Sequence, residues 1–299
     1  MSVESTELKG SIELTQPKIE RKHFNGFDLV RYTPEHPTSL IPVVIAPGYR
    51  SGADSYKLLA KVLCSQGFIV VCTDYNPKSP GQPKKWGMAD VNKVDQQAIR
   101  TAVKTEGYIN KQGIRQVHFY GHSLGSLNGV MVAKDIPESF LSCVLNSPAG
   151  IREDMNEAKA IFTLMRGSKR NEDSKKQLVK EHPELAKKVS ELKEEKFRKH
   201  NFRYFLQAIT TASTTIHQYF EGIREKGTKI IIIAESDDGF YPQELYRSIL
   251  EEAKVAVDGF VVVRGIHSEI RYTPDLCRFI CDILRTIEKR IEDQKTVNR

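Results

Sequence analysis

A short apolar segment, a serine flanked by glycines and the start of a helical pattern follow one another over residues 117–130. A serine forced onto a tight turn between a strand and a helix has a strained backbone. A Cβ at Gly121 or Gly125 would crowd the neighbouring strand or helix. We therefore predict a nucleophile elbow over residues 121–125 that holds the hydroxyl of Ser123 above the edge of a sheet. The alternative is a structural glycine turn with a passive serine, which the flanking strand and helix disfavour.

Apolar and amphipathic segments alternate along most of the chain. The apolar segments, which we interpret as strands, are 41–46, 68–73, 116–120, 141–146, 229–234 and 260–263. The amphipathic segments, which we interpret as helices, are 55–65, 89–108, 124–134, 242–253 and 274–292. Strands that are apolar on both faces belong to sheets covered by helices on two sides. This order predicts an α/β fold with a mostly parallel sheet.

An antiparallel hairpin is predicted before this alternation begins. Residues 18–24 and 27–32 flank Asn25 and Gly26, and both of these residue types tolerate positive φ. A two-residue turn of this composition is typical of type I′ geometry. Residues 1–16 are weakly patterned, and we expect them to form an N-terminal extension.

A long helix-forming stretch interrupts the alternation after the sixth predicted strand. We expect residues 17–150 and 227–292 to form the core domain, with residues 151–226 as a helical insertion. Both ends of the insertion lie at the sheet edge that carries the serine. The insertion is therefore expected to be a cap, or lid, that sets substrate size through Phe162, Phe205 and Ile209. The alternative is plain packing onto the core domain.

A serine alcohol is a weak nucleophile at neutral pH and needs a base, which in turn needs an acid. Open α/β sheets gather such groups on the loops after the strands. His267 follows the predicted strand 260–263, and Asp237 and Asp238 follow the predicted strand 229–234. The chain order is therefore Ser, Asp, His, with either aspartate as a candidate acid.

Other groups near the elbow have weaker signals. The amide of Leu124 lies at a helix N-terminus, where a developing anion is favoured. The side chain of His122 should point away from that of Ser123, so we expect a packing role for it. His118 and His217 are interpreted as core or helix-surface residues.

The whole pattern, over about residues 27–292, resembles the α/β-hydrolase superfamily, and within it the esterase, acylglycerol-lipase and serine-aminopeptidase-like branch. In that family the acid commonly lies four residues before a proline that opens the next helix. Pro242 then selects Asp238 rather than Asp237.

The resemblance also implies an oxyanion hole, formed by the amides of Leu124 and of a residue in the loop after the third strand. In the family that loop usually begins His-Gly and the next residue donates its amide, which implies Tyr49. Here Pro47 stands where the histidine is usual, while Gly48 still permits a close approach.

The activity implied by the resemblance is that of a serine hydrolase, which cleaves small-molecule carboxylic esters through an acyl-enzyme. Thioesters and amides are the next candidates. A peptidase of the same architecture would need an acid to hold a peptide amine. Glu153, Asp154 and Glu157 are candidates, but acids there suit a helix N-terminus equally well. A non-catalytic binding protein on this fold is disfavoured because all three triad residue types are present.

Composition and motif content argue against several other classes of protein. The net charge is +7, but basic and acidic residues are interleaved, and neither an aromatic platform nor a known module accompanies the lysines, so we expect no nucleic-acid partner. Neither a phosphate loop nor a metal-ligand cluster is visible, so we expect no cofactor and no metal. No apolar run could span a bilayer, and five cysteines without a C-x-x-C pair argue against a disulfide framework. With no signal-peptide core at residues 1–10, the sequence predicts a cytoplasmic protein that does not insert into membranes.

Overall fold

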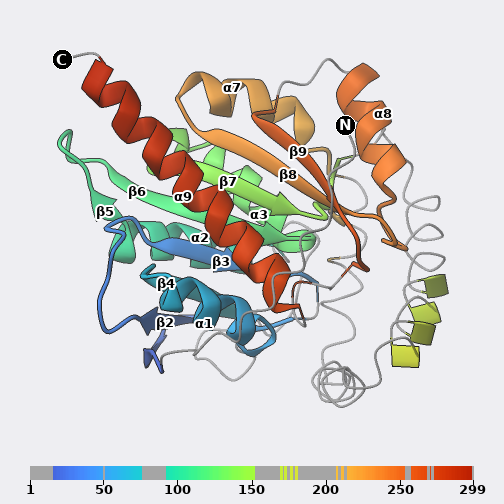
Figure 1. The fold of residues 1–299 in the computed structure, drawn as a ribbon, viewed down its shortest axis with the longest axis horizontal. Helices are drawn as coiled ribbons and strands as arrows, with labels where there is room; N and C mark the ends of the chain where they lie inside the picture. The colour runs from blue at the N-terminus through green and yellow to red at the C-terminus, as the bar shows by residue number, and fades with distance from the viewer. Residues whose placement is uncertain are drawn as a thin grey trace.

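The computed structural model describes residues 16–49, 51–75, 92–151, 214–252, 257–267, 270 and 273–297, with isolated residues between 169 and 211. These residues form a nine-stranded sheet with helices on both faces (Figure 1). Almost all of the predicted N-terminal extension and most of the predicted insertion, including Phe162, Phe205 and Ile209, lie outside the described residues.

The sheet is antiparallel at its beginning and parallel afterwards, except for a two-residue strand, β5, that pairs antiparallel with β6. Its strands are β1 (Lys18–His23), β2 (Phe27–Thr33), β3 (Val43–Ala46), β4 (Val70–Tyr75), β5 (Tyr108–Ile109), β6 (Arg115–His122), β7 (Phe140–Asn146), β8 (Lys229–Glu235) and β9 (Gly259–Val263). The spatial order is β1-β2-β4-β3-β6-β7-β8-β9, with β5 beside β6. All neighbours from β4 to β9 along this order are parallel. The predicted fold class is confirmed.

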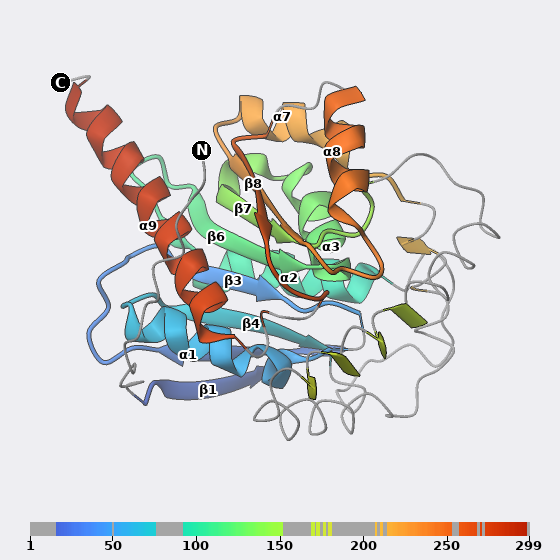
Figure 2. The same cartoon turned by 45° about the vertical axis from the view of Figure 1, so that its right-hand side comes forward.

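Helices cover the sheet in two layers, as Figures 1 and 2 show. One face carries α1 (Lys57–Ser65) and α9 (Pro274–Val297), and the other carries α2 (Lys93–Glu106), α3 (Leu124–Ala133), α7 (Phe220–Glu225) and α8 (Gln243–Glu252). Short 3₁₀ turns, η1 (Ala53–Tyr56), η2 (Pro137–Ser139) and η4 (His217–Tyr219), complete the described elements. None of the helices that the structure describes combines the length and apolar character that crossing a bilayer requires.

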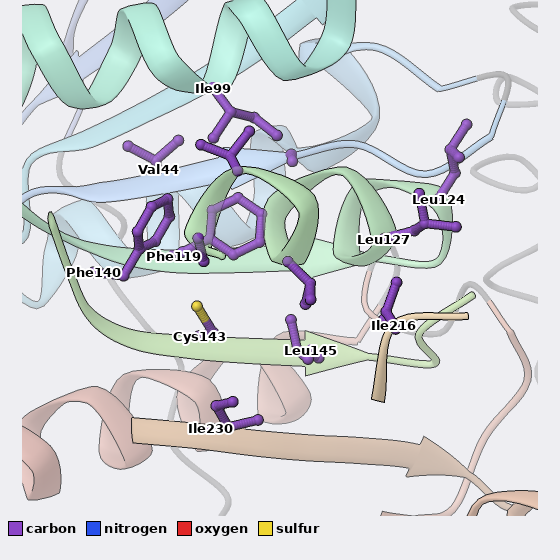
Figure 3. Packing of buried hydrophobic residues seen from close by; sticks show 14 of the residues in the cluster. Val44, Ile99, Phe119, Leu124, Leu127, Phe140, Cys143, Leu145, Ile216 and Ile230 are labelled. Carbon is purple, nitrogen blue, oxygen red and sulfur yellow. The ribbon is translucent and has the colours of Figure 1, made fainter. Parts of the chain in front are cut away.

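Aromatic and aliphatic side chains fill the layer between the sheet and α2, α3, α7 and α8 (Figure 3). Phe119 on β6 meets Phe140 on β7 edge to face, with ring centroids 5.8 Å apart. Ile216 and Ile223, which fall in the range predicted for the insertion, are buried in the same cluster as Leu145 of β7. The described segment that leads into β8 therefore packs as part of the layer that covers the sheet.

All five cysteines are buried and free. Cys64, Cys72, Cys277 and Cys281 belong to the cluster beneath α1 and α9, whereas Cys143 lies on the other face of the sheet. Burial raises the pKa of Cys64 and of Cys281 to about 12, so both remain thiols at neutral pH.

The hairpin turn differs from the predicted type I′ geometry. Gly26 has a φ of 92°, but among the described residues other than glycine only Ser123 and Ser147 have positive φ. Type I′ needs positive φ at both central residues, so that prediction is wrong. One positive φ, at the second central position, is the type II pattern, which glycine suits and which leaves Asn25 in an ordinary conformation.

Two helix ends also differ from the prediction. The predicted helix over 89–108 ends at Glu106, because Gly107 is extended (φ −60°, ψ 142°) and leads into β5. At the C-terminus α9 continues to Val297 instead of ending near residue 292. Polar residues near a helix end fit both the exposed face of a helix and a loop. The apolar periodicity alone therefore did not locate the end of either helix.

Candidate active site

The carboxyl ends of five adjacent strands meet at one edge of the sheet. Tyr49 follows β3, Ser123 follows β6, Asp238 follows β8 and His267 follows β9, while β7 lies between β6 and β8. Because parallel strands end on the same side, residues far apart in sequence share this edge. The structure therefore gathers the predicted site residues in one region.

Ser123 has the strained backbone predicted for a nucleophile elbow. Its φ is 52° and its ψ is −118°, between the end of β6 and the start of α3. Its N–H donates to the carbonyl of Asn146 (2.9 Å), and its own carbonyl accepts the N–H of Ala149 (3.2 Å). The end of β7 and the segment that follows it thus hold the strained residue at both its N–H and its carbonyl.

The two elbow glycines are required by close approach, as predicted. A Cβ at Gly121 would lie 2.6 Å from Cα of Ser126 in α3. A Cβ at Gly125 would lie 2.1 Å from the carbonyl oxygen of Ala46 in β3. Both contacts involve backbone atoms, so no side-chain movement could relieve them.

Asp238 and His267 form a buried hydrogen-bonded pair. Oδ2 of Asp238 lies 2.7 Å from Nδ1 of His267, and Oδ1 accepts the amides of Phe240 (2.7 Å) and Tyr241 (2.9 Å). A carboxylate with these partners is an acceptor, so Nδ1 of His267 carries the proton and Nε2 of the neutral ring is left to accept one. That is the tautomer a general base for serine requires.

The imidazole of His267 is enclosed by three rings. Phe240, Tyr241 and His122 have ring centroids 4.8, 5.7 and 4.9 Å away. These contacts restrict the ring, and His267 is only 8 % exposed. Within the described part of the chain no hydrogen bond joins the hydroxyl of Ser123 to His267, a contact that commonly tightens only when substrate binds.

The neighbouring acid, Asp237, is placed differently. Its Oδ2 accepts the hydroxyl of Ser236 (2.8 Å) on the exposed side of the loop, and its amide donates to the carbonyl of Gly265 (2.8 Å). Of the two candidate aspartates, Asp238, which the family resemblance selected through Pro242, is the one beside His267.

Leu124 and Tyr49, the predicted oxyanion donors, lie on the elbow and on the loop after β3. Leu124 is the first residue of α3, so its amide has no intrahelical acceptor. The loop turns tightly at Gly48, whose carbonyl accepts the N–H of Ser51 (3.1 Å). The use of these two amides by an oxyanion stays a prediction.

A buried acid that sequence reasoning missed lies in the same region. Glu235, the last residue of β8, is fully buried, and its carboxylate oxygens accept Nδ2 of Asn146 (3.3 Å) and the hydroxyl of Ser147 (3.1 Å). Ser147 has a φ of 41°. Glu235 therefore braces the same segment that holds Ser123. The signal available in the sequence was an acid ending an otherwise apolar strand.

Tyr246 supports this segment from α8. Its hydroxyl donates to the carbonyl of Pro148 (3.1 Å). Burial raises the pKa of Tyr246 well above its usual range, and the nearby carboxylates of Asp238 and Glu235 act in the same direction. The phenol thus keeps the proton that this bond uses.

His122 is buried, as expected, but it does more than pack. Its Nδ1 lies 2.6 Å from the hydroxyl of Tyr56, and its Nε2 lies 2.5 Å from the carbonyl of His267. One nitrogen of His122, one of His267 and an oxygen of Glu235 lie within 4.8 Å of one another. Both nitrogens of His122 already have hydrogen-bond partners, so a metal ion at either one would have to displace a hydrogen bond, and this cluster supports no metal assignment.

Comparison with known proteins agrees with this architecture. Residues 41–248 match the family model described as "alpha/beta hydrolase fold". Similar solved structures include an esterase from Thermogutta terrifontis (15 % identity, TM-score 0.62), which covers 90 % of this chain and 99 % of its own. A thioesterase domain from the curacin biosynthetic pathway (14 %, 0.60) covers 91 % of this chain and 100 % of its own. An epoxide hydrolase from Vigna radiata (16 %, 0.61) covers 91 % and 99 %.

At these identities the solved structures share the fold and carry no further assignment, and no curated protein matches the sequence. The family model spans more than half of the chain and includes the elbow, the strand that precedes Asp238 and Asp238 itself. The chain therefore belongs to the alpha/beta hydrolase fold family.

Proposed function

We propose that this protein is a serine hydrolase that cleaves carboxylic esters through an acyl-enzyme, with Ser123 as nucleophile, His267 as base and Asp238 as acid. The observation that carries the proposal is the buried 2.7 Å pair of His267 and Asp238 at the sheet edge that also presents the strained Ser123. A buried acid–imidazole pair next to a serine on a strand-to-helix turn is the arrangement that activates a weak alcohol.

In the proposed reaction Nε2 of His267 takes the proton of Ser123 as Oγ bonds to the ester carbonyl carbon. The carbonyl electron pair moves to oxygen, and the amides of Tyr49 and Leu124 stabilise that oxyanion, each by about 3 kcal/mol. Collapse expels the alkoxide, which takes the proton from His267. Water then repeats the sequence on the acyl-enzyme, releases the acid and restores Ser123.

The proposal is tested by labelling the purified protein with a small fluorophosphonate. Wild type should label and should hydrolyse p-nitrophenyl esters, whereas Ser123→Ala should do neither and His267→Ala should lose nearly all of both activities. Circular dichroism checks that each variant is folded. Labelling that persists in Ser123→Ala would move the nucleophile elsewhere, and an unreactive wild type would favour a binding protein on this fold.

The ester preference is tested with acyl chains of graded length beside thioesters and aminoacyl amides. We expect esters to be the best substrates. Faster cleavage of aminoacyl amides would favour the peptidase alternative, whose candidate amine-binding acids, Glu153, Asp154 and Glu157, lie outside the described residues.

We further propose that residues 151–226 include a cap over the site. Figures 1 and 2 place the described residues between 169 and 180 on the side to which the parallel strands point. Nε2 of Gln207, also from this range, donates to Oδ2 of Asp95 on α2 (2.7 Å). Phe162→Ala or Phe205→Ala should change chain-length preference while leaving the rate of labelling by a small probe unchanged. Unchanged preference in both would argue against a cap that sets substrate size.

Localisation and partners are part of the proposal. Five free, buried thiols suit a reducing cytoplasm. We propose a small-molecule acyl ester as the substrate, with no nucleic-acid partner and no stable membrane insertion. Cell fractionation of the full-length protein tests the compartment.

A further inference from the structure

The hydroxyl of Tyr56 joins two of the loops that form the candidate site. Tyr56 ends η1 and is 1 % exposed, beneath the loop after β3. Its oxygen lies 3.1 Å from the amide nitrogen of Gly48 and 2.6 Å from Nδ1 of His122. A single phenol thus connects the loop that carries Tyr49 with the elbow that carries Ser123.

The chain of hydrogen bonds has one consistent arrangement of protons when His122 is neutral. The carbonyl of His267 can only accept, so Nε2 of His122 carries the ring proton. Nδ1 of His122 is then an acceptor, and the hydroxyl of Tyr56 donates to it. The same oxygen accepts the N–H of Gly48. The order is Gly48 N–H to Tyr56, Tyr56 O–H to His122, and His122 N–H to His267.

Close packing fixes the same contact independently. A Cβ at Gly48 would lie 2.6 Å from Nδ1 of His122 and 3.1 Å from its carbonyl oxygen. The loop backbone therefore rests directly on the imidazole. Pro47, the residue before it, has neither an N–H nor a polar side-chain atom, so it offers the loop no donor. Besides the turn bond from the N–H of Ser51 to the carbonyl of Gly48, the loop donates the N–H of Gly48 to the hydroxyl of Tyr56 on η1, which ties its backbone to His122.

We infer that Tyr56 and His122 are positioning residues that hold the amide of Tyr49 in register with His267. The inference rests on the proposed function, in which that amide binds the oxyanion. Tyr49 follows Gly48 directly, so a shift of the Gly48 amide moves the donor. At the other end of this series of hydrogen bonds, the bond from His122 to the backbone of His267 sets the position of the base relative to the amide of Tyr49. Small displacements of oxyanion donors are costly because their effect depends on alignment with the transition state.

The test removes one hydroxyl and leaves the ring. Tyr56→Phe should lower kcat for p-nitrophenyl esters by about 10- to 100-fold with little change in KM, because the loss falls on the transition state. Binding of a boronic acid, which forms a tetrahedral adduct with the serine, should weaken by a similar factor. Tyr32→Phe is the matched control, since Tyr32 is an equally buried tyrosine in the same cluster and should leave kcat unchanged.

His122 variants separate the two links. His122→Asn can still meet Tyr56, and His122→Gln can still meet the carbonyl of His267, so each should lose part of the activity. Combining either with Tyr56→Phe should cost less than the product of the single effects, because the bonds act as one chain. Wild-type ¹⁵N NMR should show a proton on Nε2 of His122 and none on Nδ1, a readout that needs no variant.

The inference would be overturned if Tyr56→Phe had the same kcat and the same boronic-acid affinity as Tyr32→Phe. It would also be overturned if the NMR spectrum showed the ring proton of His122 on Nδ1 instead of Nε2. If either of these results is obtained while the wild-type protein labels at Ser123 and hydrolyses esters, the proposed function still holds and only this inference is wrong. A wild type without either activity overturns the proposed function, and this inference with it.

Discussion

Oδ2 of Asp238 lies 2.7 Å from Nδ1 of His267, although 29 positions of sequence separate the two residues. The other oxygen of the carboxylate is fully engaged by the amides of Phe240 and Tyr241. The carboxylate is therefore oriented before any ligand binds, with Oδ1 held by the two amides and Oδ2 directed at His267. This fixed orientation makes the effect of an amide at the same position predictable.

Asp238→Asn should lower kcat by about 10³- to 10⁴-fold. The backbone amides need an acceptor, so Oδ1 of the asparagine would stay with them and its NH₂ would face His267. Nδ1 would then have to accept, which places the proton on Nε2 and disables the base. Steady-state kinetics measures the loss, and melting temperature checks the fold.

Asp237→Asn is the control for that experiment. The Asp237 carboxylate contacts Ser236 on the exposed side of the loop, so kcat should stay within a few-fold of wild type. If Asp237→Asn were the more damaging change, the assignment of the acid would be wrong.

Ser147→Ala tests whether Glu235 braces the elbow. The substitution removes the hydroxyl donor to a fully buried carboxylate oxygen, at a cost of about 1–3 kcal/mol in unfolding free energy. It also loosens the segment next to Asn146, whose carbonyl holds the amide of Ser123. We expect kcat to fall by about tenfold, measured alongside urea unfolding.

Ser142→Ala is a matched substitution at the opposite end of β7. The hydroxyl of Ser142 contacts Nδ1 of His118 (2.8 Å) and is equally buried. It should lose stability by a comparable amount while keeping its activity. Equal losses of kcat in both variants would show that general stability, rather than the elbow, is responsible.

Gly125→Ala should reduce both stability and activity. The new methyl group would meet backbone atoms of Ala46 and Pro47, so either α3 or the oxyanion loop has to move, at about 1–3 kcal/mol. Gly222→Ala in α7 is the control, because its Cβ would meet nothing within 4 Å. There alanine should stabilise the helix by up to about 1 kcal/mol. Thermal melts compare the two, and a neutral Gly125→Ala would contradict the close packing.

Asp258 should give the protein a pH-dependent increment of stability. Burial alone would raise the pKa of Asp258, but hydrogen bonds from Arg224, Lys229 and the amide of Ile230 outweigh it and lower the pKa. A carboxyl whose pKa is lower when folded stabilises the fold above its unfolded pKa, about 3.9. That stabilisation disappears as the pH falls through the folded value.

Asp258→Asn should therefore lose roughly 0.5–1 kcal/mol at pH 7, and the difference from wild type should shrink below about pH 4. Urea unfolding over a pH series measures it. Asp135→Asn, which removes an exposed pair with Arg100, should change stability less. A difference that stays constant down to pH 2 would exclude the ionised carboxylate as its cause.

Apolar periodicity was sufficient to predict the sheet. Runs such as Ile230–Ile233 are buried on both faces, so their pattern depends on little except the sheet itself. The elbow was predictable for a related reason: two glycines beside one serine leave few alternatives for the backbone. Turn geometry was harder, because Asn25 tolerates positive φ without requiring it.

Long-range hydrogen bonds could not be predicted from the chain alone. The residue pattern by itself left Asp237 and Asp238 open, because it does not encode side-chain direction; only the family resemblance, through Pro242, selected Asp238. The pattern also does not predict the contact between Tyr56 and His122, 66 positions apart, or the contacts of Glu235, whose partners Asn146 and Ser147 lie at the end of β7 and directly after it. Such contacts appear only when the register of neighbouring strands is known.

The five buried cysteines can report local unfolding, because each thiol becomes accessible only when the helices that cover it separate from the sheet. A thiol reagent in solution cannot reach Cys64 or Cys277 until α1 or α9 separates from the sheet, and Cys143 reports on the opposite layer. Residues raised to a pKa of about 12, such as Cys64, would also become far more reactive on exposure. Site-by-site alkylation, read by mass spectrometry, would therefore show which face of the sheet loses its cover first.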